Sequence, residues 1–380
     1  MSGAVQRDRR RPSGSIWSMT HPLTVDEALR ARWHATGLPT QGRSAAASSG
    51  QEEVRRLGAV QAQEFEMTLW SLARRTSESR DRLVDQFARG DIVRTHTLRQ
   101  TWHFVHRNDL EMVQAATAHR VHLSNVPLYR AAGLDDRTLH KAAEVVLATL
   151  NDGPATRTEI GARLGAVGLP SSGLGLGTIM MWAELECLVV SGPLLGKRHT
   201  YVRWPGSAGR PPAEEAAATL AERYFASHGP AALDDFMAWS SLTKTAVRAA
   251  VDGLPLERTV IHDVECLWLG DLDLREWVSP QVELLNAYDE YISGLGPRVK
   301  RWLDRAHLAR DRPGTPIGVV MVDGQLAGHW RRRVRASQVD VEVLPLRQFT
   351  PAESAALDRD ADAFGAFLGL PARLRLVSVS

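Results

Sequence analysis

Cysteine is scarce in this sequence: its 380 residues include only Cys187 and Cys266, and no CxxC motif. Zinc and iron–sulfur sites need several closely spaced thiolate or imidazole ligands, so this spacing argues against both kinds of site. We therefore predict two buried, reduced thiols, no bound metal and no cofactor. Reduced thiols fit a cytoplasmic protein, because disulfides are rare in that compartment.

Long apolar runs are also missing. No stretch reaches the roughly 18 uninterrupted apolar residues that a membrane-spanning helix needs. The N-terminal sequence MSGAVQRDRRRPSGSIWSMTHPL is basic but lacks the apolar segment of a secretory signal. We expect a cytoplasmic protein with no membrane partner. Residues 1–20 are predicted to be a disordered tail, and translation starts at Met1 or at Met19.

The sequence carries little net charge, because 46 Lys and Arg residues against 44 Asp and Glu residues give +2. Nucleic-acid-binding proteins are often more basic, so the total argues weakly against DNA binding. The positive charge is clustered, however, at residues 9–11, 298–312 and 329–335. The best candidates for phosphate contacts are Lys197, Arg198, His199, Arg331, Arg332 and Arg333. A solvated charged surface is the alternative interpretation for each of them.

Common enzyme motifs are absent as well. The sequence has no Gly-x-Ser-x-Gly, no Walker A and no HExxH motif. The segment GLGLG at residues 173–177 lacks the spacing of a dinucleotide fingerprint. We interpret it as a flexible turn before a helix at 178–186, whose N-terminus is able to hold a phosphate.

A recurring order of elements organises the first three quarters of the chain. Helical periodicity at 22–35, 52–74 and 78–88 precedes paired strands in IVRTHTLRQTWHFVH. Helices at 136–151, 156–165 and 178–186 precede a hairpin at 187–204, and helices from residue 213 precede strand-like RTVIHDVECLWLG. Helices followed by a hairpin are the winged-helix plan, and its threefold repetition indicates three such units in series.

The last quarter of the chain has a different pattern. Residues 281–293 look helical, two strands from residue 316 flank a tight turn at 322–325, and a helix at 351–368 precedes a strand at 372–378. The predicted fold class is α+β, mainly α, with three tandem winged-helix domains and a small C-terminal domain that is either a β-sheet or β-barrel-like. The predicted domains cover 21–108, 109–205, 206–278 and 279–380.

Two glutamines, Gln61 and Gln63, stand one apolar residue apart in RLGAVQAQEFEMTLWSL. Glutamine is a weak acid, base and nucleophile, but its amide donates and accepts hydrogen bonds and can orient a water molecule. Two glutamines on a helix are usually surface residues. From the residues alone, the sequence indicates a DNA-binding protein and no particular reaction.

The combined motifs resemble the AlkZ-like family of bacterial winged-helix DNA glycosylases. The resemblance rests on VQAQEFEMTLWSLARR, IVRTHTLRQTWHFVHRNDL, VVSGPLLGKRHTYV, AWSSLT and LLNAYDEYISG, and it covers most of residues 22–345. It implies three winged helices and a C-terminal barrel shaped around DNA. The family's Gln–apolar–Gln signature falls on Gln61, Ala62 and Gln63. A related branch carries Asp at the second position, so Gln63 indicates the branch that gives self-resistance to natural-product genotoxins.

The resemblance also implies an activity. The expected enzyme is a monofunctional glycosylase that hydrolyses the N-glycosidic bond of N7-alkylguanine, in bulky adducts or interstrand crosslinks. Its expected partner is double-stranded DNA carrying alkylated bases, and the protein is expected to be a monomer. Gln61 and Gln63 would position the attacking water. Trp102, His103 and His96 are expected to line the same cavity, although core packing is the alternative for Trp102.

Two other functions fit the sequence. Winged helices are more often transcription regulators than enzymes, and a non-catalytic regulator would bind one operator, usually as a dimer. A protein that sequesters a toxin could use its 11 tryptophans for stacking. For the glycosylase, we expect an open groove bordered by hairpins, because a bulky adduct does not fit a tight base-flipping pocket.

Overall fold

The computed structural model describes residues 23–39, 48–76, 78–206, 209–278, 280–303 and 318–377. The predicted tail (residues 1–20), Met19, the basic run at 9–11 and most of the run at 298–312 lie outside the described residues. Helices make up about half of the described residues, and the strands form four sheets. The predicted α+β class with a larger share of helix is therefore confirmed.

The first unit follows α1 (Val25–Ala35) and consists of a helix, a short strand, two helices and a hairpin. Its elements are α2 (Gly50–Leu57), β1 (Val60–Gln61), α3 (Phe65–Arg75), α4 (Arg80–Arg89), β2 (Ile92–Thr97) and β3 (Thr101–His106), with strand order β1-β3-β2. The prediction of one helix over 52–74 is wrong, because Gly58 adopts a positive φ of 82° and ends α2. Gln61 consequently lies on a strand.

The second unit repeats this order after the long helix α5 (Leu110–Ala131), which the sequence patterns did not predict. Its elements are α6 (Asp136–Thr149), β4 (Ala155–Thr156), α7 (Arg157–Ala166), α8 (Gly173–Leu185), β5 (Val189–Leu195) and β6 (Arg198–Arg203). The glycine-rich segment is the first turn of α8 and not a preceding loop. A Cβ on Gly175 would lie 2.5 Å from Pro170, and a Cβ on Gly177 would lie 2.7 Å from the Arg157 guanidinium. Close packing thus explains both glycines.

The third unit has the same plan, with a bridge in place of the short strand. It contains α9 (Ala213–His228), a bridge between Ala231 and Leu267, α10 (Leu233–Ser240), α11 (Lys244–Val251), β7 (Glu257–Ile261) and β8 (Val264–Trp268). The helices and hairpins predicted for the second and third units are confirmed as elements. Their interpretation as winged helices, and the domain boundaries, stay predictions.

The C-terminal part forms an open sheet with strand order β13-β12-β11-β10-β9. Its elements are β9 (Val282–Asn286), α12 (Glu290–Ser293), α13 (Pro297–Lys300), β10 (Gly318–Val322), β11 (Gln325–Val334), β12 (Val339–Pro345), α14 (Pro351–Leu368) and β13 (Ala372–Leu376). The described sheet does not close, so it is not the expected barrel. The helix predicted at 281–293 is present only at its end, as α12, and its first half is strand β9. Every residue of β9 is buried, and a strand buried on both faces lacks the alternation that would distinguish it from a helix.

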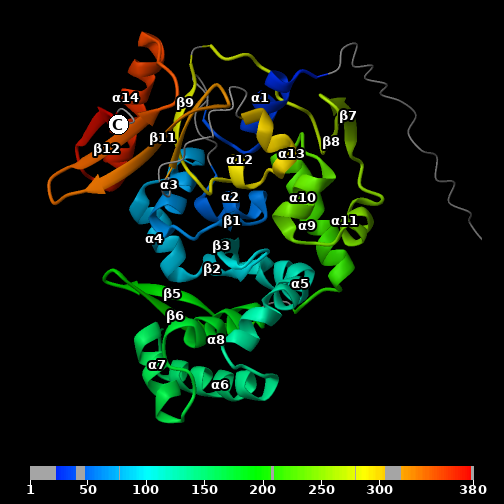
Figure 1. The fold of residues 1–380 in the computed structure, drawn as a ribbon, viewed down its shortest axis with the longest axis vertical. Coiled ribbons are helices and arrows are strands. Elements are labelled where there is room, and N and C mark those ends of the chain that lie inside the picture. Colours follow the sequence, from blue (N-terminus) through cyan, green and yellow to red (C-terminus); the bar gives the residue numbers. More distant parts are fainter. Residues whose placement is uncertain are drawn as a thin grey trace, which may run out of the picture.

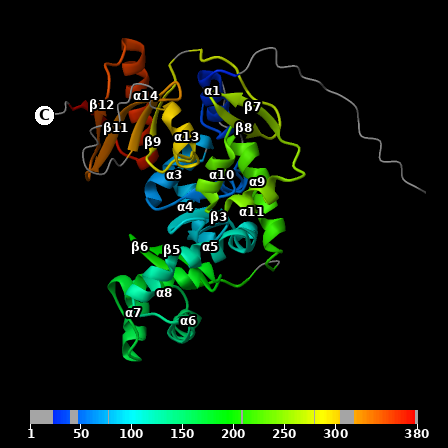
Figure 2. The same cartoon turned by 45° about the vertical axis from the view of Figure 1, so that its right-hand side comes forward.

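The first unit lies at the centre of the molecule (Figure 1). The second unit projects below it in both ribbon views, the third unit packs beside it, and the C-terminal sheet lies on its other side (Figure 2). Trp70 of α3 packs in the core of the C-terminal sheet, Ala59 lies in the core of the third unit, and Leu194 packs on the core around Phe65. Each neighbour therefore supports the segment that carries Gln61.

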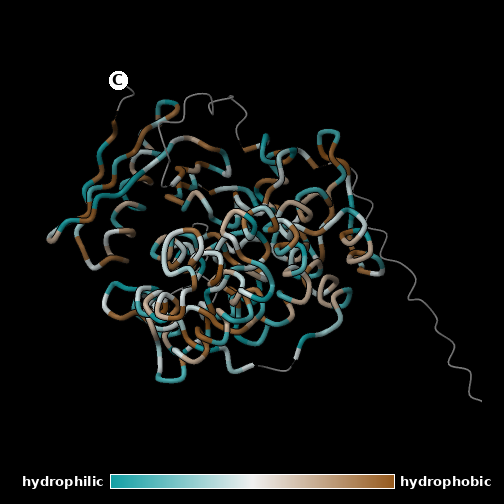
Figure 3. The backbone as a smooth tube through the Cα atoms, turned by 60° about the horizontal axis from the view of Figure 1, so that its bottom comes forward, coloured by the Kyte–Doolittle hydropathy of each residue, from teal (hydrophilic) through white to brown (hydrophobic). Residues whose placement is uncertain are grey.

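Among the described residues, no helix is long and apolar enough to cross a membrane. Hydrophobic segments in the coloured part of the chain are short and alternate with hydrophilic ones (Figure 3).

Candidate functional site

Gln61 is held by its place in the sheet and by two hydrogen bonds of its backbone. It ends β1 opposite His103 of β3. Its amide N–H donates to Glu290 Oε1 at 2.8 Å, and its carbonyl oxygen accepts from the Thr68 hydroxyl at 3.0 Å. The residue is 7% exposed, whereas Gln63, in the loop before α3, is exposed. The two glutamines therefore have different environments: one is fixed in the protein and the other is open to solvent.

The Gln61 side chain has one defined partner. Arg99, in the turn between β2 and β3, donates from Nη2 to Gln61 Oε1 at 3.1 Å. A guanidinium only donates hydrogen bonds, so it must contact the carbonyl end of the amide. Within the described part of the chain, the Gln61 amide nitrogen has no hydrogen-bond partner, and it is not among the side-chain nitrogens closed off from solvent. The amide NH₂ is thus the end of Gln61 that is open to a ligand.

Glu290 is a buried carboxylate that gathers four donors. Besides the Gln61 amide, it accepts from Trp239 Nε1 at 2.9 Å, His228 Nε2 at 3.3 Å and the Ser293 hydroxyl at 3.4 Å. Burial alone raises its pKa, but the His228 hydrogen bond, the Arg99 charge and the Gln61 amide outweigh burial and lower the pKa to about 2. Glu290 is therefore ionised, and its negative charge offsets the buried Arg99.

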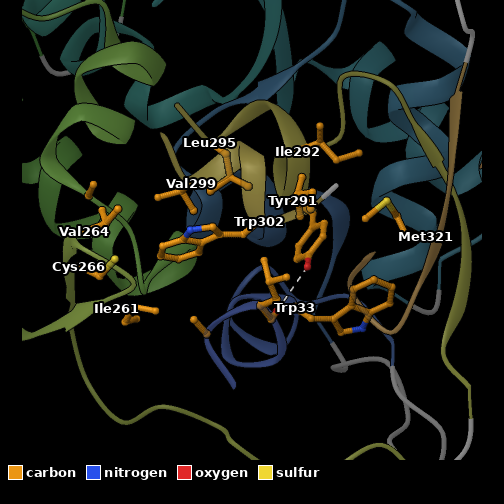
Figure 4. Close-up of a cluster of buried hydrophobic side chains, with 14 of the residues drawn as sticks. Trp33, Ile261, Val264, Cys266, Tyr291, Ile292, Leu295, Val299, Trp302 and Met321 are labelled. Atoms are coloured by element: carbon orange, nitrogen blue, oxygen red, sulfur yellow. Dashed lines mark hydrogen bonds between the residues drawn. The ribbon is translucent and has the colours of Figure 1, made fainter. Parts of the chain in front are cut away.

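The segment around Glu290 is rigidly anchored. Its neighbour Asp289 receives two hydrogen bonds from the Arg75 guanidinium, at 2.7 and 2.8 Å, in a pair that is almost fully buried. On the other side, Tyr291 points into the core formed with α1, edge-on to Trp33 at 5.3 Å between ring centroids, while Trp302 lies in the same cluster (Figure 4). A rigid segment of this kind fixes the position of the Gln61 backbone.

His103 is completely buried and neutral. Burial, followed by the Arg99 charge, lowers its pKa to about 3. Its Nδ1 lies 3.0 Å from the Thr101 carbonyl oxygen and its Nε2 lies 3.4 Å from Arg99 Nη2. The carbonyl oxygen only accepts and the guanidinium only donates, so Nδ1 carries the proton. His103 therefore supports Arg99 and does not act as an acid near neutral pH.

His96 and Trp102 lie on the opposite face of the hairpin. Paired residues share a face, so Gln61 and His103 face one side, and His96 and Trp102, one residue out of phase, face the other. These two side chains line a cavity of about 250 Å³ against the second unit, which Gln61 and Gln63 do not line. The expectation that His96, Trp102 and His103 share one cavity with the glutamines thus differs from the structure. The reason is the register of β1 against β3.

The face with Trp102 is a charged and aromatic cluster of its own. The Arg94 guanidinium lies 4.3 Å from the Trp102 ring centroid, and Trp102 Nε1 donates to the buried Glu184 at 3.3 Å. His96 Nδ1 also contacts Glu184. Arg94 Nε donates to the Ala62 carbonyl oxygen at 3.0 Å, so this cluster also holds the peptide between the two glutamines.

Comparisons with known proteins identify the family of this chain. The model of the family described as DNA glycosylase AlkZ-like matches residues 54–367. The chain belongs to the AlkZ-like DNA glycosylase family. An "interstrand DNA cross-link repair glycosylase" from Streptomyces sahachiroi is 25% identical over 327 residues, covering 79% of this chain and 87% of that protein. The solved structure of Streptomyces sahachiroi DNA glycosylase AlkZ has a TM-score of 0.75 at 21% identity, covering 94% of this chain and all of that one.

The family assignment shows a glycosylase enzyme, and the solved structure shows a shared fold. In this AlkZ-like chain, the matched region contains Gln61, Gln63, Arg99 and Glu290. No group of three or more His, Cys, Asp or Glu residues in the described ranges is arranged to hold a metal ion. Cys266 is buried and Cys187 half-buried, and neither forms a disulfide.

The predicted DNA-binding residues of this AlkZ-like glycosylase fall into two groups. Lys197, Arg198 and His199 are exposed at the tip of the β5–β6 hairpin. This tip reaches the first unit, because the His199 ring lies 5.2 Å from Phe65 at the start of α3. It therefore lies near Gln63, two residues before Phe65.

The arginine run on β11 is divided between two faces. Arg331 donates to Glu342 at 2.6 Å and Arg333 lies 3.5 Å from the same carboxylate, so both are paired on one side. Arg332 is half-buried, and burial lowers its pKa while the nearby charges of Glu64 and Glu66 raise it. It therefore lies near the loop of the glutamine motif. The structure brings Arg332, but not its neighbours, towards that loop.

Sequence reasoning missed Arg99 and Glu290. Arg99 was visible only as one residue of a predicted hairpin turn, and its contact with Gln61 depends on the pairing of β1 with β3. Glu290 is one of two adjacent carboxylates in an otherwise apolar segment, AYDEYIS. Buried carboxylates are rare unless they are paired, so acidic residues in an apolar segment are the signal that could have found it.

His103 predicts a pH-dependent stability. In the unfolded chain a histidine has a pKa near 6.5, and burial lowers the pKa of His103 to about 3, so the folded protein resists protonation. Its contribution to the free energy of unfolding is complete above pH 6.5 and is lost as the pH falls towards 3. When the pH is lowered from 7.5 to 5, we expect the free energy of unfolding of His103→Gln to fall by about 2 kcal/mol less than that of wild type. Urea unfolding at both pH values measures the difference, and equal losses would contradict it.

Proposed function

We propose that this AlkZ-like glycosylase hydrolyses the N-glycosidic bond of N7-alkylguanine in DNA, with bulky adducts or interstrand crosslinks as its substrates. The observation that carries the proposal is the fixed Gln61 beside the exposed Gln63, at the Gln–apolar–Gln motif of the matched region. The Streptomyces sahachiroi relative is named for interstrand crosslink repair, which supports this substrate class. Self-resistance to a genotoxin is the physiological role that we propose.

The chemistry needs no strong acid. N7-alkylation makes guanine cationic, so the base departs as a neutral molecule and takes the electron pair of the glycosidic bond. A water oxygen forms the new bond to the anomeric carbon and releases a proton to solvent. Exposed Gln63 is placed to orient this water, and positioning of a reactant is worth several kcal/mol of the barrier. The motif Gln61–Ala62–Gln63 contains no lysine, so the proposed route has no Schiff base.

The repeated units suit an open DNA-binding surface. We interpret them as three winged helices in a monomeric, cytoplasmic protein, with the β5–β6 hairpin and Arg332 bordering the groove at the glutamine motif. Gln63 is exposed, and neither Gln61 nor Gln63 lines the cavity beside Trp102. An exposed Gln63 fits an open groove better than a closed base-flipping pocket, and an open groove tolerates bulk on the base.

The test uses duplexes that carry one N7-methylguanine, one bulky N7-guanine adduct or one N7-linked crosslink. We expect alkali-labile abasic sites at the lesion and none in undamaged DNA. If base release were lost for the larger adducts, bulky lesions would not be substrates of this enzyme. A footprint on one defined sequence with no base release from any of these duplexes would contradict the proposal.

The hairpin tip gives a separate prediction. We expect Lys197→Ala with Arg198→Ala to weaken duplex binding and to lower the slope of log affinity against log salt by roughly 0.9 for each phosphate that the tip no longer neutralises. Lys141→Ala is the matched control, because Lys141 is an exposed residue on α6 of the same unit. Fluorescence anisotropy over a salt series measures both, and an unchanged slope in the double variant would show that the tip does not bind phosphate.

A further inference from the structure

We propose that Arg99 is a positioning residue that fixes the Gln61 amide with its NH₂ towards the DNA, so that Gln61 acts as a hydrogen-bond donor to the departing base. This inference rests on the proposed function and concerns the same site. It changes the role of Gln61: its carbonyl oxygen is engaged by a cation and is not free to stabilise positive charge on the sugar.

The geometry restricts the amide to one orientation. Arg99 Nη2 donates to Gln61 Oε1 at 3.1 Å, and a flipped amide would place two sets of donor hydrogens against each other. Arg99 is itself fixed, since its Nη1 donates to the Ser293 carbonyl oxygen at 3.2 Å and its Nη2 lies 3.4 Å from His103 Nε2. The Gln61 backbone is fixed by Glu290. The amide NH₂ is therefore preorganised, which is the condition for electrostatic catalysis.

The departing base supplies the acceptor. As the glycosidic bond breaks, its electron pair enters the purine ring, so electron density rises on the ring acceptors N3 and O6. A donor aimed at one of these atoms binds the transition state more strongly than the cationic ground state. The buried Arg99 charge would oppose the positive charge of the lesion, and ionised Glu290 offsets it. Gln63 is exposed, and among the described residues no arginine or lysine donates to its side-chain carbonyl oxygen. Its role in the proposal is therefore to orient the water.

The first experiment separates donor from acceptor with Gln61→Glu. This isosteric change keeps an oxygen for Arg99 but replaces the NH₂ with a second oxygen. We expect the single-turnover rate of base release at saturating protein to fall on the order of 100-fold or more, as for Gln61→Ala. A Gln61→Glu enzyme that keeps or exceeds the wild-type rate would overturn the proposal, because the carbonyl would then be the working group.

The second experiment tests Arg99 through the rate and the affinity separately. We expect Arg99→Met to lower the saturated single-turnover rate by roughly 10- to 100-fold while the Kd for lesion DNA changes only a few-fold. Arg99→Lys should recover part of the rate, and Gln61→Ala with Arg99→Met should be no slower than Gln61→Ala alone. Arg137→Met is the matched control, because Arg137 is an exposed residue on α6.

A different outcome for Arg99→Met would contradict the positioning role of Arg99. If Arg99→Met raises the Kd with a lower salt slope and leaves the saturated rate at the wild-type value, Arg99 binds phosphate and does not position Gln61. Thermal melting of each variant shows whether it is folded, and the lysine variant keeps the test valid if the methionine variant is unstable. Base release by the wild-type protein tests the proposed function independently, so failure of the two ideas can be told apart.

Discussion

Replacement of both Gln61 and Gln63 by alanine is expected to abolish base release from N7-alkylated duplexes while leaving duplex binding within a few-fold of wild type. The two glutamines flank Ala62 and would act on the two partners of the reaction, the base and the water. Loss of a single preorganised donor typically costs about 10²- to 10³-fold in rate. The loss of both should therefore reduce single-turnover release to the background of spontaneous depurination.

The matched control is Gln348→Ala, which removes an exposed glutamine in the loop before α14. It should release base at the wild-type rate. Because Gln63 is exposed and Gln61 is fixed mainly through its backbone, the double variant should fold normally. Residual release within about tenfold of wild type would show that other residues carry the reaction.

Replacement of Asp289 by alanine is expected to have the largest effect on stability, about 3–5 kcal/mol in the free energy of unfolding. The change leaves the Arg75 guanidinium buried without its carboxylate, and this pair is 1% and 0% exposed. Asp289 also caps α12 by accepting from the Tyr291 amide at 2.9 Å. Without these two interactions, the segment that presents Glu290 to the Gln61 backbone is loosened.

Urea unfolding at neutral pH measures this effect. Asp81→Ala is the matched control, since its carboxylate lies 3.6 Å from Arg80 but is 91% exposed. Surface ion pairs contribute about 0–1 kcal/mol, so this control should be close to wild type. If Asp289→Ala and Asp81→Ala were equally stable, the buried pair would not be what anchors the segment.

The elements with strong local signals could be predicted from the sequence. The paired strands predicted in IVRTHTLRQTWHFVH and the hairpin predicted at 187–204 are present, as are the helices predicted from residue 213 and at 351–368. These patterns depend on residues close together in the chain. The Gln–apolar–Gln motif is also local, so it could be found in the sequence, but its position in the fold could not be predicted.

The elements that failed depend on tertiary contacts. A two-residue strand such as β1 exists only because β3 pairs with it, so a periodic sequence around Gln61 favoured a helix instead. Strand β9 is buried by neighbours on both faces and therefore carried no alternation. In each case the missing information was the identity of the packing partner.

The candidate site divides in the same way. Gln61 and Gln63 could be identified from the sequence motif. The face of the sheet on which Trp102 and His96 lie depends on the strand register, which pairs Gln61 with His103. The partners of Gln61 come from residues 38 and 229 positions away in the sequence. Long-range contacts of this kind assign Arg99 and Glu290 to the site, and no sequence spacing indicated them.

The most direct test of the central claim is to quantify the base released from a duplex that carries one N7-alkylguanine. Mass spectrometry should detect free N7-alkylguanine in a one-to-one ratio with abasic strands for the wild-type protein, and none above background for the variant that lacks Gln61 and Gln63. Borohydride should trap no protein–DNA adduct. Absence of free base with wild-type protein, or a covalent adduct trapped by borohydride, would contradict the account.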